Sequence, residues 1–306
     1  MRASPALGPY ALLGGAQLAV GAAAIFARYA LSGAGPLAVG ASRLTIAAVV
    51  LLVAAAIRPQ SRENARPSPV REARLAFAGI ALAAHFGTWI ASLQYTTVAV
   101  STLLVATTPI WTALYDAVVL KQALSRRSAW AFAAGGAGLA MVAGFNVTPP
   151  PVPGYPVLGA LLALAGGIAM AAYLLLVRDV RTEMRTRAIV TRTYAWAAIV
   201  LIAAAAVAHQ PVPAVRDATS WGGILGMALI SQLLGHTALN AALRWFSPSA
   251  VAFSTLIEPV SAAVLAYVIF FESLAPVAIA GGFVLLGAIA VVLREERARA
   301  SPEPAM

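Results

Sequence analysis

The sequence has 306 residues, of which 61% are hydrophobic and only 10% are charged, and its formal net charge is +10. Soluble domains contain roughly 45–50% apolar and 25% charged residues, so a soluble fold cannot cover this much apolar surface. The composition therefore predicts an integral membrane protein. The chain has no cysteine, which excludes disulfides and thiolate metal sites, and its three histidines are too scattered to predict a metal cluster.

Ten segments of the sequence are long and apolar enough to cross a membrane as helices, which takes about 20 mainly apolar residues. The proline-rich stretch 149–153 interrupts the chain near its middle, because proline lacks the amide hydrogen that a helix needs. The apolar part of the first segment is too long for the core of a signal peptide. We expect an all-α integral membrane protein with ten transmembrane helices, at residues 8–31, 36–57, 74–95, 97–120, 127–145, 154–177, 187–208, 218–243, 247–271 and 275–293.

The basic residues are concentrated in alternate loops, and this predicts the orientation of the chain. If the N-terminus is cytoplasmic, the cytoplasmic segments carry nearly all basic residues and the outer loops carry only Arg216. Membrane proteins retain positive residues on the cytoplasmic side. The positive net charge therefore needs no nucleic-acid partner. We expect a multi-pass protein of the bacterial inner membrane with both termini in the cytoplasm.

A shift of 150 residues superimposes the first five segments on the last five. Each half has an odd number of segments, so the second half enters the membrane in the opposite sense. Such inverted repeats are typical of secondary transporters, and a duplication kept only for packing is the alternative. We expect repeats at 8–145 and 154–294, followed by a cytoplasmic tail at 295–306. The matched pairs are Arg28 with Arg178, Leu93 with Leu243, Pro109 with Pro259, Ala113 with Ala263, and Leu124 with Leu274.

Two stretches of the sequence carry a pattern beyond that of a general membrane helix, and a glycine-rich helix follows each. The first contains Ser101-Thr102-Leu103-Leu104, Thr108-Pro109-Ile110-Trp111 and Lys121-Gln122-Ala123-Leu124. The second contains Ala250-Val251-Ala252-Phe253, Ile257-Glu258-Pro259-Val260 and Phe271-Glu272-Ser273-Leu274. These stretches resemble the paired EamA domains of the drug/metabolite transporter superfamily. The family turn Gly-Glu-x-Leu lacks its glycine in both halves here, and its glutamate in the first.

The resemblance covers nearly the whole chain, from about residue 8 to residue 294. It implies ten helices, inverted halves, cytoplasmic termini and transport of small metabolites, often as export. Among members of the superfamily, the chain is most similar to general metabolite and amino-acid exporters. The resemblance says little about the substrate.

Polar side chains near the bilayer centre are the candidates for a substrate cavity. An ionisable group there costs several kcal/mol unless it is paired or hydrated. Glu258 lies near the midplane beside Pro259, and it and His85 are the candidates for proton coupling. The alternatives are a paired residue at a helix kink for Glu258 and a neutral histidine bonded between helices for His85. The cavity candidates are Gln17, His85, Trp89, Thr107, Thr108, Trp111, Gln232, His236 and Glu258.

The spacing of these candidates supports some of the assignments. Gln232, His236 and Asn240 recur every four residues, which predicts one polar helix face turned toward a cavity or a neighbouring helix. Thr108 is matched to Glu258 by the repeat, so the two halves are expected to present different groups to one site. Arg43 is expected either to extend toward the membrane surface or to pair with a carboxylate.

Other classes of membrane protein lack their motifs in this sequence. It contains no Gly-x-Ser-x-Gly serine, no His-Glu-x-x-His zinc motif and no phosphate-binding loop for ATP. We therefore expect a secondary transporter, not an enzyme, that exports amino acids or drugs by alternating access. Its partners are a small-molecule substrate, the lipid bilayer and coupling protons, with no cofactor and no metal. The alternative is an intramembrane enzyme, or a flippase for lipid-linked substrates, on the same helical frame.

Overall fold

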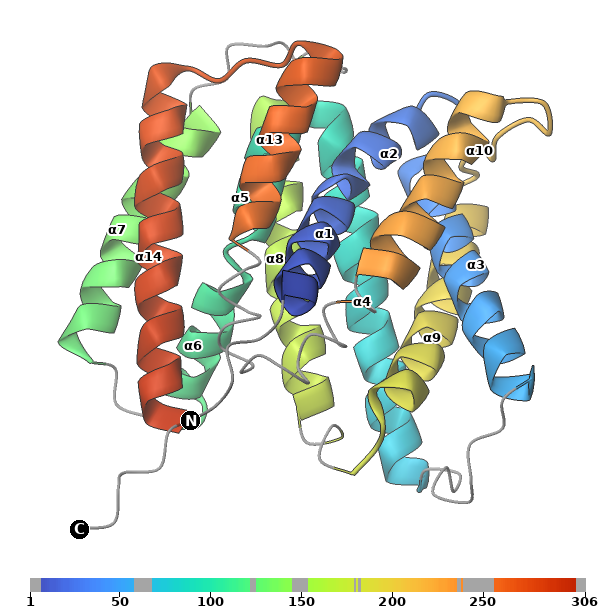
Figure 1. The fold of residues 1–306 in the computed structure, drawn as a ribbon, viewed down its shortest axis with the longest axis horizontal. Helices are drawn as coiled ribbons and strands as arrows, with labels where there is room; N and C mark the ends of the chain where they lie inside the picture. The colour runs from blue at the N-terminus through green and yellow to red at the C-terminus, as the bar shows by residue number, and fades with distance from the viewer. Residues whose placement is uncertain are drawn as a thin grey trace.

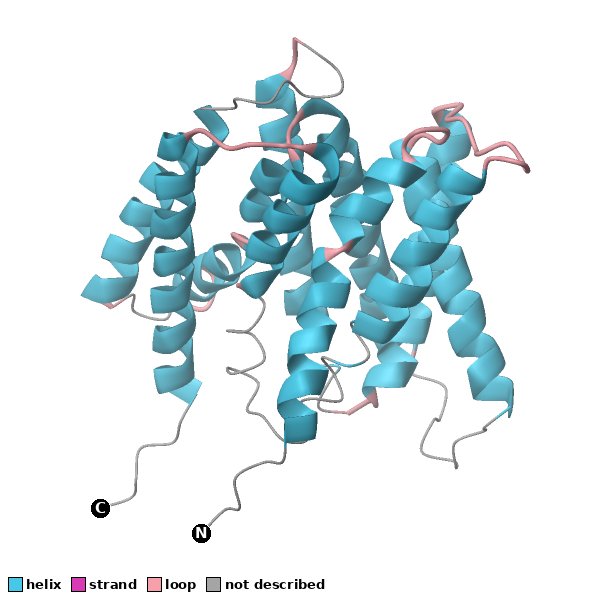
Figure 2. Ribbon diagram, turned by 45° about the horizontal axis from the view of Figure 1, so that its top comes forward, coloured by secondary structure: helices cyan, strands magenta, loops and turns pink. Residues whose placement is uncertain are grey.

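The computed structural model describes residues 7–57, 68–121, 125–144, 154–178, 180, 183–235, 238 and 256–300. Over these residues the regular structure is entirely helical (Figures 1 and 2). The elements are α1 (Leu7–Gly21), α2 (Ala23–Ala30), α3 (Pro36–Ile57), α4 (Pro69–Tyr95), α5 (Val98–Val105), α6 (Thr108–Val118), α7 (Arg126–Gly144), α8 (Pro156–Arg178), α9 (Thr186–Val207), α10 (Ala218–Leu225), the π-helix η2 (Gly226–Gly235), α13 (Ile257–Phe270) and α14 (Pro276–Ala300).

Six helical stretches of the described chain are long and apolar enough to cross a membrane, and two shorter apolar helices follow them. This agrees with a multi-pass membrane protein, and the count of ten spans stays a prediction. The six long stretches are Ala11–Ala30, Pro36–Ile57, Pro69–Tyr95, Val98–Val118, Pro156–Arg178 and Thr186–Val207, and the shorter ones are Ile257–Phe270 and Pro276–Val292.

Several helices differ in their limits from the predicted segments. Helix α4 begins at Pro69, five residues before the predicted start, because Ser68 caps it by accepting a hydrogen bond from the Arg71 amide. Its 27 residues make it longer than the hydrocarbon core of about 30 Å, since a helix rises about 1.5 Å per residue. Helix α14 continues to Ala300, so the first six residues of the predicted tail are helical.

Two predicted spans are divided in the structure. The break between α1 and α2 at Ala22 is slight, because the Ala22 amide still bonds to Leu18 and the Phe26 amide to Ala22. The break between α5 and α6 is larger and lies next to Pro109. A third predicted span changes from the α-helix α10 to the π-helix η2 at Gly226. Irregular turns of this kind inside membrane helices often occur at functional sites.

The two predicted halves are interleaved and do not lie side by side as separate bodies. Helix α4 lies against α8 and α9, α3 against α9, and α1 against η2 and α13. Helices α7 and α14 pair at one end of the molecule, and α3, α9 and α10 lie at the other, with the remaining helices between them (Figure 1).

Small residues dominate the contacts between helices. Alanine is the most frequent residue among the buried apolar side chains, while large side chains such as Val53, Phe77 and Phe283 point outward. Membrane helices associate through close packing of small residues, because lipid tails are as apolar as the side chains that they solvate. At the contact between α7 and α14, a Cβ added to Gly138 would lie 2.7 Å from the carbonyl oxygen of Gly281.

We expect Gly138→Val to destabilise the protein by about 1–3 kcal/mol, because overpacking a close helix contact forces the backbones apart. Gly136→Val on the same helix is the matched control, since a Cβ at Gly136 meets nothing within 4 Å. The measurement is thermal unfolding of both variants in detergent. Equal melting temperatures for the two variants would contradict the close contact between α7 and α14.

Candidate functional site

A buried arginine is the centre of the candidate site. Arg43 is the eighth of the 22 residues of α3, and its side chain is 1% exposed. Its Nε and Nη2 atoms donate to Oε1 of Gln232 on η2 at 3.0 Å and 2.5 Å. Of the two alternatives predicted for Arg43, extension toward the membrane surface does not occur. The other alternative, pairing with a carboxylate, has its counterpart in an electrostatic interaction with Glu258. The side chain turns inward and joins α3 of the first half to η2 of the second.

Further groups of the second half surround this arginine. The Gln232 side chain also bonds to Tyr194 of α9, whose side chain is buried. Glu258, at the start of α13, interacts electrostatically with Arg43. Burying a charge costs free energy unless it is paired or hydrogen-bonded, and these groups supply both kinds of compensation. The structure thus brings Gln232 and Glu258 together around a residue that was not among the predicted cavity residues.

Aromatic rings of α4 form the opposite wall of the site. The guanidinium carbon of Arg43 lies 4.2 Å from the centre of the Phe86 ring and 5.8 Å from that of Trp89. Contacts of this kind between a cation and an aromatic face are favourable, most of all where water is excluded. The His85 ring stacks on Trp89, with 4° between their planes. The predicted residues His85 and Trp89 therefore lie in the same cluster as Arg43.

His85 joins α4 to α8. Its Nδ1 atom lies 2.9 Å from the carbonyl oxygen of Gly166. A carbonyl oxygen can only accept, so Nδ1 carries the proton in this bond. The geometry is the one expected of a neutral histidine bonded between helices, which was the structural alternative for His85. A role of His85 in proton coupling stays a prediction.

Thr107 and Thr108 satisfy the backbone at the break between α5 and α6. Pro109 has no amide hydrogen, so the carbonyl of Val105 loses its usual helical partner. Thr108 Oγ1 donates to that carbonyl at 2.8 Å, and Thr107 Oγ1 donates to the Leu104 carbonyl at 2.6 Å. A membrane interior has no water to bind such carbonyls, so hydroxyl groups must replace it. The two threonines thus have a structural task, whatever they do for a substrate.

Helix α8 links this break to the arginine cluster. Thr108 Oγ1 also lies 3.2 Å from the Gly167 carbonyl, next to the Gly166 carbonyl that binds His85. Trp111 is held to the same break, because its Nε1 donates to Thr107 Oγ1 at 3.0 Å. A Cβ at Gly167 would lie within about 3.2 Å of the oxygens at this break. A side chain at Gly167 would therefore be tightly packed against these oxygens.

The remaining predicted residues lie near Glu258 or outside the described chain. Gln17 is completely buried on α1. One turn later, a Cβ at Gly21 would lie 3.3 Å from the Glu258 carbonyl and closer still to Ser261. Helix α1 therefore packs tightly against the first turn of α13, which contains Glu258. His236 lies outside the described residues.

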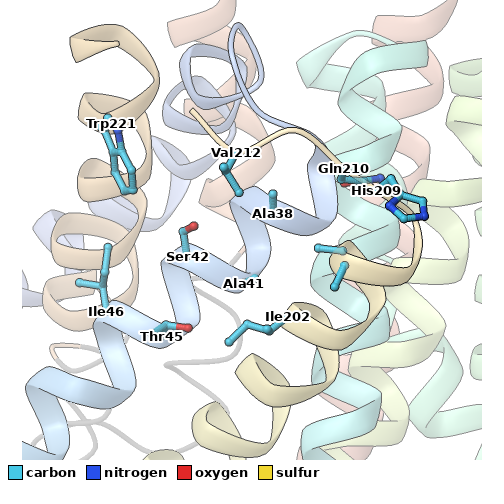
Figure 3. Close-up of a pocket in the computed structure, with 12 residues that line it drawn as sticks. Ala38, Ala41, Ser42, Thr45, Ile46, Ile202, His209, Gln210, Val212 and Trp221 are labelled. Carbon is cyan, nitrogen blue, oxygen red and sulfur yellow. The ribbon is translucent and has the colours of Figure 1, made fainter. Parts of the chain in front are cut away.

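A pocket of about 500 Å³ lies away from the arginine cluster, on another face of α3 (Figure 3). Its lining is mainly apolar and includes none of the predicted cavity residues. It is therefore not the polar cavity that the sequence predicts. Its lining residues are Ala38, Ala41, Ser42, Thr45, Ile46, Ile202, Ala205, Ala206, His209, Gln210, Val212 and Trp221.

Two of the ion pairs that join the halves involve Arg28 and Arg178, the arginines matched by the repeat. Arg28 of α2 binds Glu272 at 2.7 Å, and the other oxygen of Glu272 accepts from the Val98 amide at 2.7 Å. Burial raises the pKa of the Glu272 carboxyl, and the Arg28 charge and the Val98 amide oppose that rise. Arg178 of α8 binds Asp116 of α6 at 2.9 Å. The sequence analysis did not identify these two pairs, since their partners are far apart along the chain.

The described residues hold no group of three or more histidines, aspartates and glutamates that could bind a metal ion. The chemistry that the described residues of the cluster offer is hydrogen bonding and charge. Arg43, Gln232 and Tyr194 can orient a polar ligand, while Phe86 and Trp89 can contact its apolar part. Arg43 could have been found from its depth, because it is a charged residue well inside a predicted span.

Comparison with known families identifies the chain. The sequence profile of the EamA-like transporter family matches residues 8–144 and 157–294. The chain belongs to the EamA-like transporter family. The resemblance to the drug/metabolite transporter superfamily is therefore confirmed, and with it a multi-pass membrane transporter for a small-molecule substrate.

Solved structures share the fold of this chain. Twenty-seven chains match, and one of them, described as "Crystal structure of protein", is 17% identical with a TM-score of 0.62. The match covers 97% of this chain and 100% of the other. At this identity the likeness concerns the fold alone. No curated protein matches the sequence significantly.

We expect Thr108→Val to destabilise the protein by about 1–2 kcal/mol, because it leaves the Val105 carbonyl without a partner inside the membrane. Thr108→Ser is the matched control, since it keeps the hydroxyl. Thermal unfolding in detergent measures both variants. If the valine variant has the melting temperature of the wild type, the hydrogen bond from Thr108 to the Val105 carbonyl does not stabilise the break, and the hydroxyl is free for another role.

Proposed function

We propose that this EamA-like protein is a secondary transporter that exports small organic metabolites across the bacterial inner membrane by alternating access. Two inverted five-helix repeats rock around a central site, and both termini lie in the cytoplasm. The observation that carries the proposal is the buried contact between Arg43 and Gln232. A charge placed deep between the halves of a membrane protein is costly and points to a function.

The pattern of helix contacts supports the inverted repeat. Under the 150-residue shift, the contact of α4 with α8 corresponds to that of η2 with α1, and both occur. Helix α3 is matched to α9 and α7 to α14 by the same shift, and each matched pair is in contact, as a two-fold relation between the halves predicts. Helices α6 and α13 begin within one residue of matching places, at Thr108 and Ile257, and each has a proline in its first turn. Broken helices at the repeat interface are common in secondary transporters.

The two terminal ion pairs support alternating access. Arg28 and Arg178 are matched by the repeat, and each binds a carboxylate near the end of a matching segment in the other half. Helix α2 ends at the upper face of the molecule and α8 at the lower face (Figure 1). The two ion pairs, called latches below, can therefore hold the halves together on opposite sides of the membrane and break in turn.

The two latches differ in exposure. The side chains of the Arg28–Glu272 pair are 14% and 7% exposed, whereas that of Arg178 is 44% exposed. This supports a state that is closed on the side of Glu272 and looser on the side of Asp116. In the proposed orientation the looser side faces the cytoplasm, where an exporter takes up its substrate.

The test is transport by the purified protein in proteoliposomes, with labelled amino acids, organic acids and cationic drugs, each with and without a pH gradient. We expect at least one class to move in a saturable way. Glu258→Gln should slow proton-driven transport by about tenfold or more, which corresponds to about 1.36 kcal/mol of barrier. Glu295→Gln is the control, since Glu295 lies near the end of α14 with Arg127 at 3.9 Å.

The outcomes separate two parts of the proposal. If no class moves under any gradient, the transport function is wrong. If transport occurs and Glu258→Gln behaves like Glu295→Gln, transport stands and proton coupling through Glu258 is wrong.

A further inference from the structure

Arg43 has a buried nitrogen that no described group binds. Its Nε and Nη2 atoms both donate to the single oxygen Oε1 of Gln232. Its Nη1 atom is buried and has no hydrogen-bond partner within the described parts of the chain. Leaving a charged donor buried without a partner is unfavourable, so such a nitrogen is suited to a ligand that brings its own acceptor.

The chain's own carboxylate does not fill this position. Glu258 interacts electrostatically with Arg43, but Nη1 has no hydrogen bond to it or to any other described residue. Gln232 is held on its other side by Tyr194, so its amide is already engaged. The guanidinium is thus held by Gln232, and its Nη1 atom has no hydrogen-bond partner among the described residues. A fixed and partly unsatisfied guanidinium is a preformed site for an anion.

The surroundings of the guanidinium indicate what kind of anion fits. The Phe86 ring lies 4.2 Å and the Trp89 ring 5.8 Å from the guanidinium carbon. Rings in these places offer contact area to a carbon skeleton but no charge for a second polar group. A carboxylate on an apolar body therefore fits the site better than a compact, strongly hydrated inorganic anion.

We propose that Nη1 of Arg43 binds the carboxylate of a small organic substrate, whose apolar part lies against Phe86 and Trp89. This rests on the proposed transport function and adds the substrate class. The planar guanidinium donates paired hydrogen bonds that match a carboxylate. Because Arg43 belongs to the first half and its holder Gln232 to the second, the bound carboxylate lies where the halves meet.

The first experiment compares ligands on the unmodified full-length protein in detergent. The probes are butyrate, phenylacetate and phenylalanine, each paired with its own amide, and binding is measured by calorimetric titration. Each amide keeps the size of its acid and loses the charge. We expect at least one carboxylate to bind about tenfold or more tighter than its amide, the effect of losing a charged hydrogen bond. Equal affinities within every pair, or no binding by any carboxylate, would overturn the proposal.

The second experiment tests Arg43 itself. Arg43→Gln should abolish the preference for the carboxylate, and Arg43→Lys should keep part of it, since lysine retains the charge without the planar fork. Arg192→Gln is the matched control, because Arg192 is an arginine bound to Glu72 at 2.7 Å, away from the cluster. If Arg43→Gln does not fold, the carboxylate preference of Arg43→Lys is compared with that of the wild type, and we expect it to be weaker. A carboxylate preference that survives unchanged in the Arg43 variant overturns the proposal.

Transport of the same probes distinguishes this proposal from the function on which it rests. If the proteoliposomes carry neutral or cationic solutes and no carboxylate, the transport function stands and the carboxylate site is wrong. If carboxylates bind through Arg43 but nothing is transported, the site stands and the transport function is wrong.

Discussion

A guanidinium that is buried between helices in a membrane protein constrains everything around it. Arg43 cannot reach water, so the chain must supply oxygen and aromatic partners at fixed places on three other helices. Gln232 and Glu258 come from the second half of the sequence, and Phe86 from the first. The charge therefore ties together segments nearly 200 residues apart, and the two halves can separate only by changing its partners.

The same lack of water explains the other irregular features near the cluster. The break beside Pro109 is possible because Thr107 and Thr108 bind the carbonyls that the helix leaves free. Gly166 and Gly167 then bring α8 close enough for its own carbonyls to receive His85 and Thr108. The two glycines thus do more than permit close packing, because their backbone carbonyls accept hydrogen bonds from His85 and Thr108.

Much of the fold follows from the sequence, and less of the site does. Apolar length predicts the long helices, and Pro109 together with its repeat partner Pro259 marks irregular places. The depth of His85 correctly indicates a polar contact, but its partner is a backbone carbonyl that no side-chain pattern identifies. The sequence leaves two alternatives for Arg43, extension to the surface or pairing with a carboxylate, because a long side chain can reach either. Its inward turn depends on Gln232, whose position relative to α3 is set only by tertiary packing.

The central claim is that Arg43 and Gln232 depend on each other across the two halves, and a double-mutant cycle tests it most directly. Thermal unfolding in detergent is measured for Arg43→Met, Gln232→Leu and the double variant. Gln232→Leu alone leaves a buried charge without its main partner and should be the most destabilised, whereas the double variant should recover part of the loss. We expect a coupling of about 0.5–3 kcal/mol. Strictly additive effects of the two substitutions would contradict the account.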